Sequence, residues 1–457
     1  MQNKADKTAK SDSFFHSRLQ AFVANALFPS GQGDWYKSKG YGKDPKGGEY
    51  AAFDDFLAQQ KNDETAIYHK AFKGLDFELD MVKSQLTNEK ECQLEVLKCA
   101  PLKIATQKPG TGKHIVYFPG ANTYYQACFR DITAAANQTG ATVHAFNFPG
   151  TGKSTGKVRE ANDCINAGIA VVHSLLRQGV KPDDIILQGD CYGAAIALEV
   201  KKQFEEQANT QIRIIMNNSF KSFKAAVCDM ITDSPWLPNL LKSIVKRLLE
   251  YTGWHITPGK KYVHADPYQC HIQHISDQTL ISSSLSKKVD KYQEEIKTET
   301  TSSQKRKPKI DNCPEDYKED RKALDGKHMV KVKASAEKRL GNKFGRDKFG
   351  NINAHFADLC ELELLNGDSV YEGYVNDYIE RSDKYIAKHP QEKNPKDIKV
   401  CFLAAANSPE LTLDEAEEIQ SVIEFIHPRE FNLDSDVDDM DIDWDNPQEV
   451  DTIWMKF

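Results

Sequence analysis

Short apolar runs alternate with helical patterns through the middle of the chain. Alternating or continuous apolar positions predict six strands, at residues 75–82, 92–97, 114–118, 141–146, 185–187 and 213–216. Apolar positions three and four residues apart predict three helices between them, at residues 124–139, 158–177 and 192–204. Strands that alternate with helices in this way are typical of a doubly wound, mostly parallel sheet.

Residues 220–258 interrupt this alternation. Leu237, Leu240, Leu241, Ile244, Val245, Leu248 and Leu249 share one face of a strongly amphipathic helix. Trp236 and Trp254 bracket that helix. The pattern is compatible with a helical lid over a binding site and equally with an ordinary core helix.

Charge divides the remainder of the chain. Residues 287–348 hold 19 Lys and Arg against 12 Asp and Glu, which predicts a basic, partly disordered insertion. Seven aspartates crowd residues 434–445, which predicts an acidic C-terminal tail over 430–457. Residues 1–74 mix helical and Gly-rich sequence and are expected to be an N-terminal extension. The main domain is therefore expected at 75–429.

Composition narrows the classes of function. The net charge of −7 gives no reason to expect nucleic-acid binding. The chain has no run of 18 apolar residues, so no membrane-spanning helix is expected. Its first residues are polar, so no cleaved signal peptide is expected. The ten cysteines lack paired spacing, which indicates reduced thiols in a cytoplasmic type of environment.

Residues Gly189-Asp190-Cys191-Tyr192-Gly193 carry the clearest chemical signal. An apolar strand ends at the first glycine, and a helical pattern begins after the cysteine. This layout matches the sharp strand-to-helix turn G-x-S-x-G, with cysteine in place of the usual serine. The glycines are needed because strand and helix must pass closely around a strained nucleophile. The helix N-terminus behind Cys191 would favour its thiolate.

Two further motifs follow predicted strands upstream of this turn. Pro119-Gly120-Ala121-Asn122 follows the strand at 114–118, and the Gly-rich residues 147–156 follow the strand at 141–146. In this order the motifs resemble those of the α/β-hydrolase superfamily. The resemblance implies an α/β-hydrolase type of sheet, with the helical lid and the charged insertion added to it.

The same resemblance implies a catalytic acid and a histidine base downstream of Cys191. Asp277, which follows a predicted strand at 270–275, is the preferred acid, with Asp266 and Asp233 as alternatives. His355 follows a small, turn-rich stretch and is the preferred base. His264, His271 and His274 lie too near Asp277 in sequence. The basic insertion would account for the long interval between Asp277 and His355.

An oxyanion hole needs two backbone N–H groups directed at the developing negative charge. The resemblance assigns one to Tyr192, the residue after the nucleophile. It assigns the other to the turn after the strand at 114–118, where both Ala121 and Asn122 qualify.

No cofactor and no metal are expected. Gly150–Ser154 suggests a phosphate-binding loop, but Asn147 stands where that motif needs its first glycine. The acidic run from Asp434 suggests a calcium loop, but Asp439 occupies the position of the obligatory glycine. A solvated acidic tail explains that run better.

The predicted reaction is hydrolysis of an ester or thioester through an acyl-thioester on Cys191. Dienelactone hydrolases and polyester synthases set a precedent for cysteine at this turn. An acyltransferase with the same triad and a non-catalytic binding protein on the same scaffold are the alternatives. The expected partner is an acyl-containing small molecule or lipid, with a membrane surface or host protein as a further partner for residues 236–255.

The chain as a whole resembles effector hydrolases of the Legionella type. The resemblance rests on three features: the turn Gly189–Gly193 with its cysteine, which we call the elbow, the charged insertions and the acidic C-terminus. It implies secretion into a host cell without a cleaved signal peptide.

Overall fold

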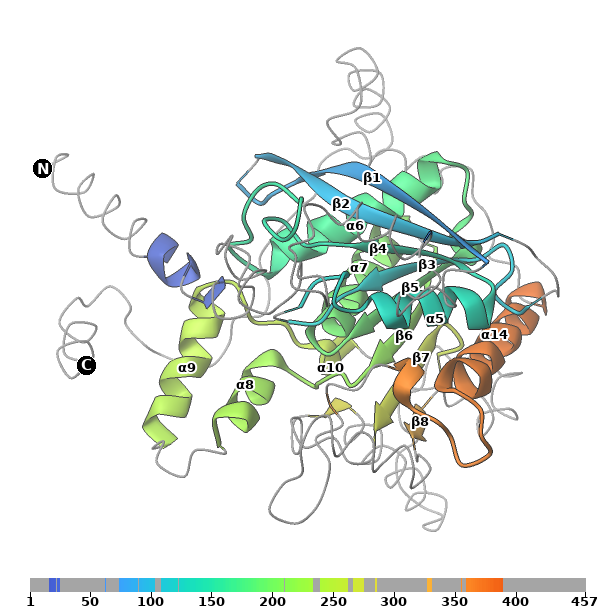
Figure 1. The fold of residues 1–457 in the computed structure, drawn as a ribbon. Coiled ribbons are helices and arrows are strands. Elements are labelled where there is room, and N and C mark those ends of the chain that lie inside the picture. Colours follow the sequence, from blue (N-terminus) through green and yellow to red (C-terminus); the bar gives the residue numbers. More distant parts are fainter. Residues whose placement is uncertain are drawn as a thin grey trace, which may run out of the picture. The chain divides into compact units, whose positions relative to one another are not determined.

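An eight-stranded sheet forms the centre of the protein (Figure 1). The computed structural model describes residues 16–21, 23–24, 62, 74–88, 90–102, 108–121, 123–208, 210–232, 239–261, 266–274, 284–285, 327–330, 355 and 359–388. The strands are β1 (Leu75–Gln85), β2 (Glu91–Pro101), β3 (His114–Phe118), β4 (Thr142–Phe146), β5 (Ile185–Asp190), β6 (Arg213–Asn217), β7 (Gln269–His274) and β8 (Lys327–Val330).

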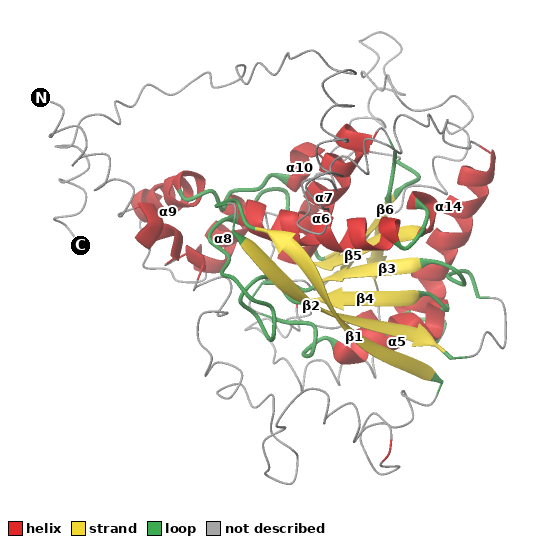
Figure 2. Ribbon diagram, turned by 90° about the horizontal axis from the view of Figure 1, so that it is seen from above, coloured by secondary structure: helices red, strands yellow, loops and turns green. Residues whose placement is uncertain are grey.

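The strand order is β1-β2-β4-β3-β5-β6-β7-β8. β1 pairs with β2 and β2 with β4 in antiparallel fashion, and all later neighbours are parallel. Figure 2 shows the long β1 and β2 twisting across the parallel strands. This is the mostly parallel, doubly wound sheet of the α/β-hydrolase type that the sequence predicts.

Helices cover both faces of the sheet. They are α5 (Phe129–Thr139), α6 (Ala161–Arg177), α7 (Tyr192–Ala208), α8 (Phe223–Thr232), α9 (Asn239–Tyr251), α10 (Pro258–Lys261) and α14 (Asn376–Lys388). Side chains of β3 alternate between two core clusters: Val116 and Phe118 join α6 and α7, whereas Ile115 and Tyr117 join α5 and the C-terminal helices. The period of two along a strand therefore builds two cores from one sequence run.

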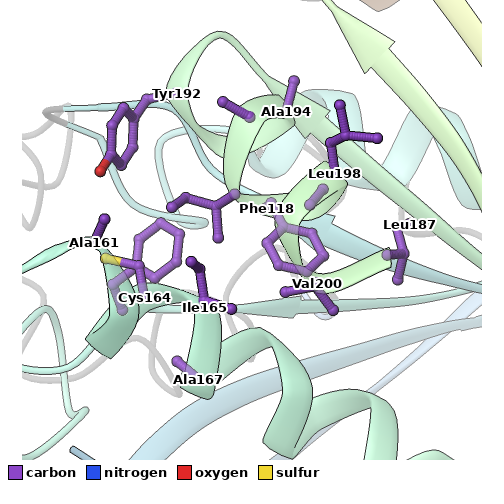
Figure 3. Packing of buried hydrophobic residues seen from close by; sticks show 14 of the residues in the cluster. Phe118, Ala161, Cys164, Ile165, Ala167, Leu187, Tyr192, Ala194, Leu198 and Val200 are labelled. Atoms are coloured by element: carbon purple, nitrogen blue, oxygen red, sulfur yellow. The ribbon is translucent and has the colours of Figure 1, made fainter. Parts of the chain in front are cut away.

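The packing of α6 and α7 on the sheet is close (Figure 3). A Cβ atom added to Gly168 of α6 would lie 2.8 Å from Cγ2 of Val200, and it would also overlap the ring of Phe118. Glycine at this position lets α6 approach α7 and β3, behind the turn that carries Cys191.

Two predicted helices begin later than expected. Residues 124–128 form successive turns, because Asn147 Oδ1 accepts a hydrogen bond from the Tyr125 backbone N–H. α6 begins at Ala161 instead of 158, because the side chain of Asp163 accepts hydrogen bonds from the backbone N–H groups of Arg159 and Glu160. Both differences come from side chains that compete for backbone donors at a helix N-terminus.

The amphipathic helix predicted within 220–258 is α9. Leu249 is buried, and Val245 and Leu248 pack against the same core cluster as α6 and α7. These contacts favour an ordinary core helix for the second half of α9. Trp236 and Leu237 lie outside the described residues, and a lid over 220–258 stays a prediction. None of the helices in the described ranges has the length and apolar character to cross a membrane.

The sheet continues into the segment predicted as a basic insertion. β8 lies within residues 287–348 and pairs in parallel with β7, with His271 opposite Lys327. No apolar pattern in the sequence predicts this strand. The acidic tail at 430–457 and almost all of the N-terminal extension lie outside the described residues.

Candidate active site at the end of strand β5

Cys191 occupies a sharp turn between β5 and α7. Its φ angle is 50°, in the left-handed region that costs an L-residue about 1–2 kcal/mol. The Cys191 backbone N–H donates a hydrogen bond of 2.9 Å to the carbonyl oxygen of Asn217 at the end of β6. The turn is therefore held in a strained conformation by the neighbouring strand, and its cysteine is half-buried.

The two glycines of the motif are sterically required. A Cβ atom on Gly189 would lie 2.6 Å from the backbone nitrogen of Ala194, and one on Gly193 would lie 2.5 Å from the carbonyl oxygen of Pro119. Backbone atoms cannot give way as a flexible side chain could. The spacing of glycines around Cys191 thus follows from close contact of β5, α7 and the loop after β3.

The loop after β3 carries one of the two predicted oxyanion donors, Ala121 or Asn122. A Cβ atom on Gly120 would lie 3.3 Å from the Asp190 carbonyl oxygen, so the loop runs directly against the turn. Ala121 and Cys191 both pack against the same core cluster, and Tyr192 is the first residue of α7. Asn122 lies outside the described residues. The assignment of the donating N–H groups stays a prediction.

A buried carboxylate fixes this loop to the Gly-rich stretch after β4. Glu95 of β2 is 2% exposed, and its Oε2 accepts hydrogen bonds from Asn147 Nδ2 at 2.9 Å and from the Lys153 backbone N–H at 3.0 Å. Asn147 in turn accepts the N–H of Tyr125 at 3.0 Å. One carboxylate and one amide thereby hold two loops at the carboxyl end of the sheet.

His355 is buried at the same end of the sheet. Its carbonyl oxygen accepts a hydrogen bond of 3.3 Å from Nδ2 of Asn218, the residue directly after β6. Since Asn217 binds the backbone of Cys191, consecutive residues of the chain hold the predicted nucleophile and the predicted base. The assignment of His355 as the base stays a prediction.

Asp190 adds a carboxylate that the sequence analysis did not assign to the site. Tyr117 donates its phenolic hydrogen to Asp190 Oδ2, and Asn217 Nδ2 donates to Oδ1 at 2.9 Å. Burial raises the pKa of Asp190, while the bonds from Tyr117 and Asn217 and the positive charge of nearby His355 oppose that rise. The position of Asp190 inside the elbow motif was visible in the sequence, but its contact with Tyr117, 73 positions away, was not.

The predicted acid, Asp277, lies outside the described residues, three positions after the last residue of β7. Its alternative Asp266 stands before β7, where it accepts hydrogen bonds from Gln269 Nε2 and the Tyr268 N–H. That position is at the amino end of the strand, away from Cys191, so Asp266 does not fit the role of the acid. The other alternative, Asp233, lies outside the described residues.

The competing histidines differ in position. His271 and His274 are buried within β7, and His264 lies outside the described residues. Across the described ranges, no group of three or more His, Cys, Asp and Glu side chains is arranged to hold a metal ion.

The segment after His355 is bound to the back of the site. Tyr371 accepts a hydrogen bond of 2.7 Å from Gln188 Nε2 of β5 and donates one of 2.7 Å to Asp131 of α5. Asp131 also accepts the Cys360 backbone N–H at 2.9 Å. This buried network joins the C-terminal segment to β5, the strand that precedes Cys191.

Comparison with known proteins identifies one matching family and several structures. A family model described as SdbC, C-terminal domain, matches residues 350–402, which include His355 and α14. No curated protein sequence matches the chain.

Similar solved structures include esterases. Esterase Pf2001 of Pyrococcus furiosus is 17% identical, with 51% of this chain and 80% of that chain covered and a TM-score of 0.34. An alpha-beta hydrolase from Vibrio vulnificus is 14% identical, with 49% and 70% covered and a TM-score of 0.35. A bacterial heroin esterase is 11% identical, with 54% and 77% covered and a TM-score of 0.34. Similarities of this size carry no evidence about the reaction.

Proposed function

We propose that the protein is an acyl hydrolase that cleaves an ester or thioester through Cys191. The observation that carries the proposal is the backbone of Cys191, held at a φ of 50° between β5 and α7 by Asn217 and two obligatory glycines. Such strain persists only where the surrounding structure enforces it, and it concentrates at functional sites. A cysteine with a purely structural role gains nothing from this conformation.

In the proposed mechanism His355 accepts the thiol proton, and the Cys191 thiolate attacks the acyl carbonyl carbon. The N–H of Tyr192 and that of Ala121 or Asn122 would stabilise the oxyanion. Collapse breaks the bond to the alcohol or thiol, which leaves with the proton from His355. Water, deprotonated by His355, then hydrolyses the thioester and releases the carboxylic acid. Asp277 would orient the imidazole.

Activity towards short-chain p-nitrophenyl esters and acyl thioesters tests the proposal. Cys191→Ala should abolish turnover, and His355→Ala should lower kcat by about 10²- to 10⁴-fold to a residual but measurable rate. Intact-mass spectrometry should detect an acyl adduct in the parent protein but not in Cys191→Ala. Cys360→Ala is the matched control, because Cys360 is also half-buried among the described cysteines. Turnover that survives Cys191→Ala would reject the proposal. Acyl transfer to an added amine or alcohol would instead identify an acyltransferase.

The effector assignment is part of the same proposal. Its support is the resemblance noted in the sequence, together with the match of residues 350–402 to the SdbC C-terminal domain. A translocation assay with a reporter fused to the full chain, in bacteria with and without a functional secretion system, tests it. Equal reporter signals in the two strains would contradict it.

A further inference from the structure

Two consecutive asparagines at the end of β6 bind different parts of the candidate site. Asn217 accepts the Cys191 backbone N–H and donates its Nδ2 hydrogen to Asp190. Asn218 donates its Nδ2 hydrogen to the carbonyl oxygen of His355 at 3.3 Å. The end of one strand therefore connects the elbow with His355, although Cys191 and His355 are 164 positions apart in the sequence.

Asn218 has a strained backbone and makes three hydrogen bonds through its N–H and its side-chain amide. Its φ is 48°, and apart from Cys191 it is the one non-glycine residue with positive φ within the described ranges. Its N–H donates to the Ile272 carbonyl at 2.9 Å, and its Oδ1 accepts the N–H of His274 at 3.2 Å. Asparagine tolerates this conformation better than most residues, and its short amide offers a donor and an acceptor together.

We infer that Asn218 is a positioning residue, which fixes the backbone of His355 and thereby the distance of its imidazole from Cys191. A turn alone would be served as well by glycine, which adopts positive φ without strain. Asn218 is 2% exposed, so its amide does not face water, and its two side-chain hydrogen bonds connect β7 with His355. This inference rests on the proposed function.

Asn218→Gly tests the inference, because it relieves the strain and removes both side-chain hydrogen bonds. The expected result is a fall in kcat of about 10- to 100-fold with little change in KM, as for a small misplacement of a catalytic group. The matched control is Asn366→Gly, which removes an exposed turn asparagine bonded to Asp368 and should leave kcat unchanged.

A double-mutant cycle separates positioning from stability. If Asn218 acts through His355, Asn218→Gly should cause less than about a twofold further loss in the His355→Ala background. An equal loss in both backgrounds would overturn the inference, and so would wild-type activity of Asn218→Gly. Wild-type activity of His355→Ala would instead reject the proposed function.

Asn218→Asp provides a second variant if Asn218→Gly does not fold. It keeps the acceptor for His274 and tolerates positive φ, but it lacks the donor to His355. The same cycle applies to it. Failure of both variants to fold would show that Asn218 stabilises the fold at the carboxyl ends of β6 and β7, and it would overturn the inference.

Discussion

Tyr117 donates its phenolic hydrogen to Asp190, the residue that immediately precedes Cys191. Tyr117 is fully buried near the carboxyl end of β3, and β3 is the neighbour of β5. The proposed nucleophile therefore follows a carboxylate whose pKa depends on a hydrogen bond from a core residue. A change in that core should reach the site through the protonation of Asp190.

The first prediction concerns the pH dependence of stability. Burial raises the pKa of Asp190 above its ordinary value of 3.8. The folded protein then binds more protons than the unfolded chain between these two pKa values, so this contribution to stability falls as the pH rises through that window. Asp190→Asn removes the contribution. The thermal midpoint of Asp190→Asn should therefore rise relative to that of the parent protein as the pH increases above 3.8.

Tyr117→Phe gives the complementary result. It removes a donor that favours charged Asp190, so the pKa should rise further and the loss of stability should extend to higher pH. Midpoint curves of the parent and Asp190→Asn that stay parallel across the pH range would contradict the first prediction.

The second prediction concerns thiol reactivity. Burial raises the pKa of Cys92 to about 11 and that of Cys270 to about 12, and it also raises the pKa of Cys99 and Cys164. Iodoacetamide at pH 7.5 should therefore label the half-buried Cys191 at least about 10-fold faster than these four thiols. Peptide mapping by mass spectrometry measures the rates. In concentrated urea the labelling rates of the five cysteines should become equal. If Cys191 still reacted faster there, the cause would be its neighbours in sequence and not burial of the other thiols, which would contradict the prediction.

The third prediction concerns Gly193, two positions after Cys191. Gly193→Ala forces a methyl group against the Phe118 and Pro119 carbonyl oxygens, so the free energy of unfolding should fall by about 3 kcal/mol. Gly179→Ala is the control, because Gly179 has a φ of +85° but open space around it. Gly179→Ala should lower the free energy of unfolding by about 1–2 kcal/mol. Equal losses, measured by chemical denaturation, would show that the close approach in the elbow is not rigid.

The fourth prediction concerns the attachment of α14. Arg213 of β6 is fully buried and donates to Ser382 at 3.0 Å, to Asp383 at 2.8 Å and to the Asp183 carbonyl. Arg213→Met keeps much of the volume but loses these bonds, so unfolding free energy should fall by about 3 kcal/mol. The control is Lys98→Met, which breaks an exposed ion pair with Glu78 and should cost under about 1 kcal/mol. A reversed order of the two losses in urea denaturation would contradict the assignment.

The sheet was largely predictable because its strands are strongly apolar. The strand at 114–118 is confirmed residue for residue, and β5 begins at Ile185 as predicted. The elbow was recognisable because its steric demands act within five residues, Gly189 to Gly193, and so leave a local sequence pattern.

Features that depend on contacts between distant segments were not predictable. Asn217 and Asn218 follow an ordinary apolar run, and their role arises only because β6 lies between β5 and β7. β8 has the sequence Lys-His-Met-Val inside a basic stretch, so pairing with β7 and not its own pattern makes it a strand. Asp190 acquires its significance from Tyr117, which lies 73 residues away in the sequence.

The C-terminal segment has a consequence for how relatives of this protein can be recognised. Leu359, Val370, Tyr371 and Ile379 share a core cluster with Ile115 and Tyr117 of β3. Residues 359–388 therefore cannot fold as a detachable module, because one wall of their interior is the sheet itself. Any chain that inherits this stretch must also inherit a surface like that of β3 and α5, even where the sequence of the sheet has diverged beyond detection.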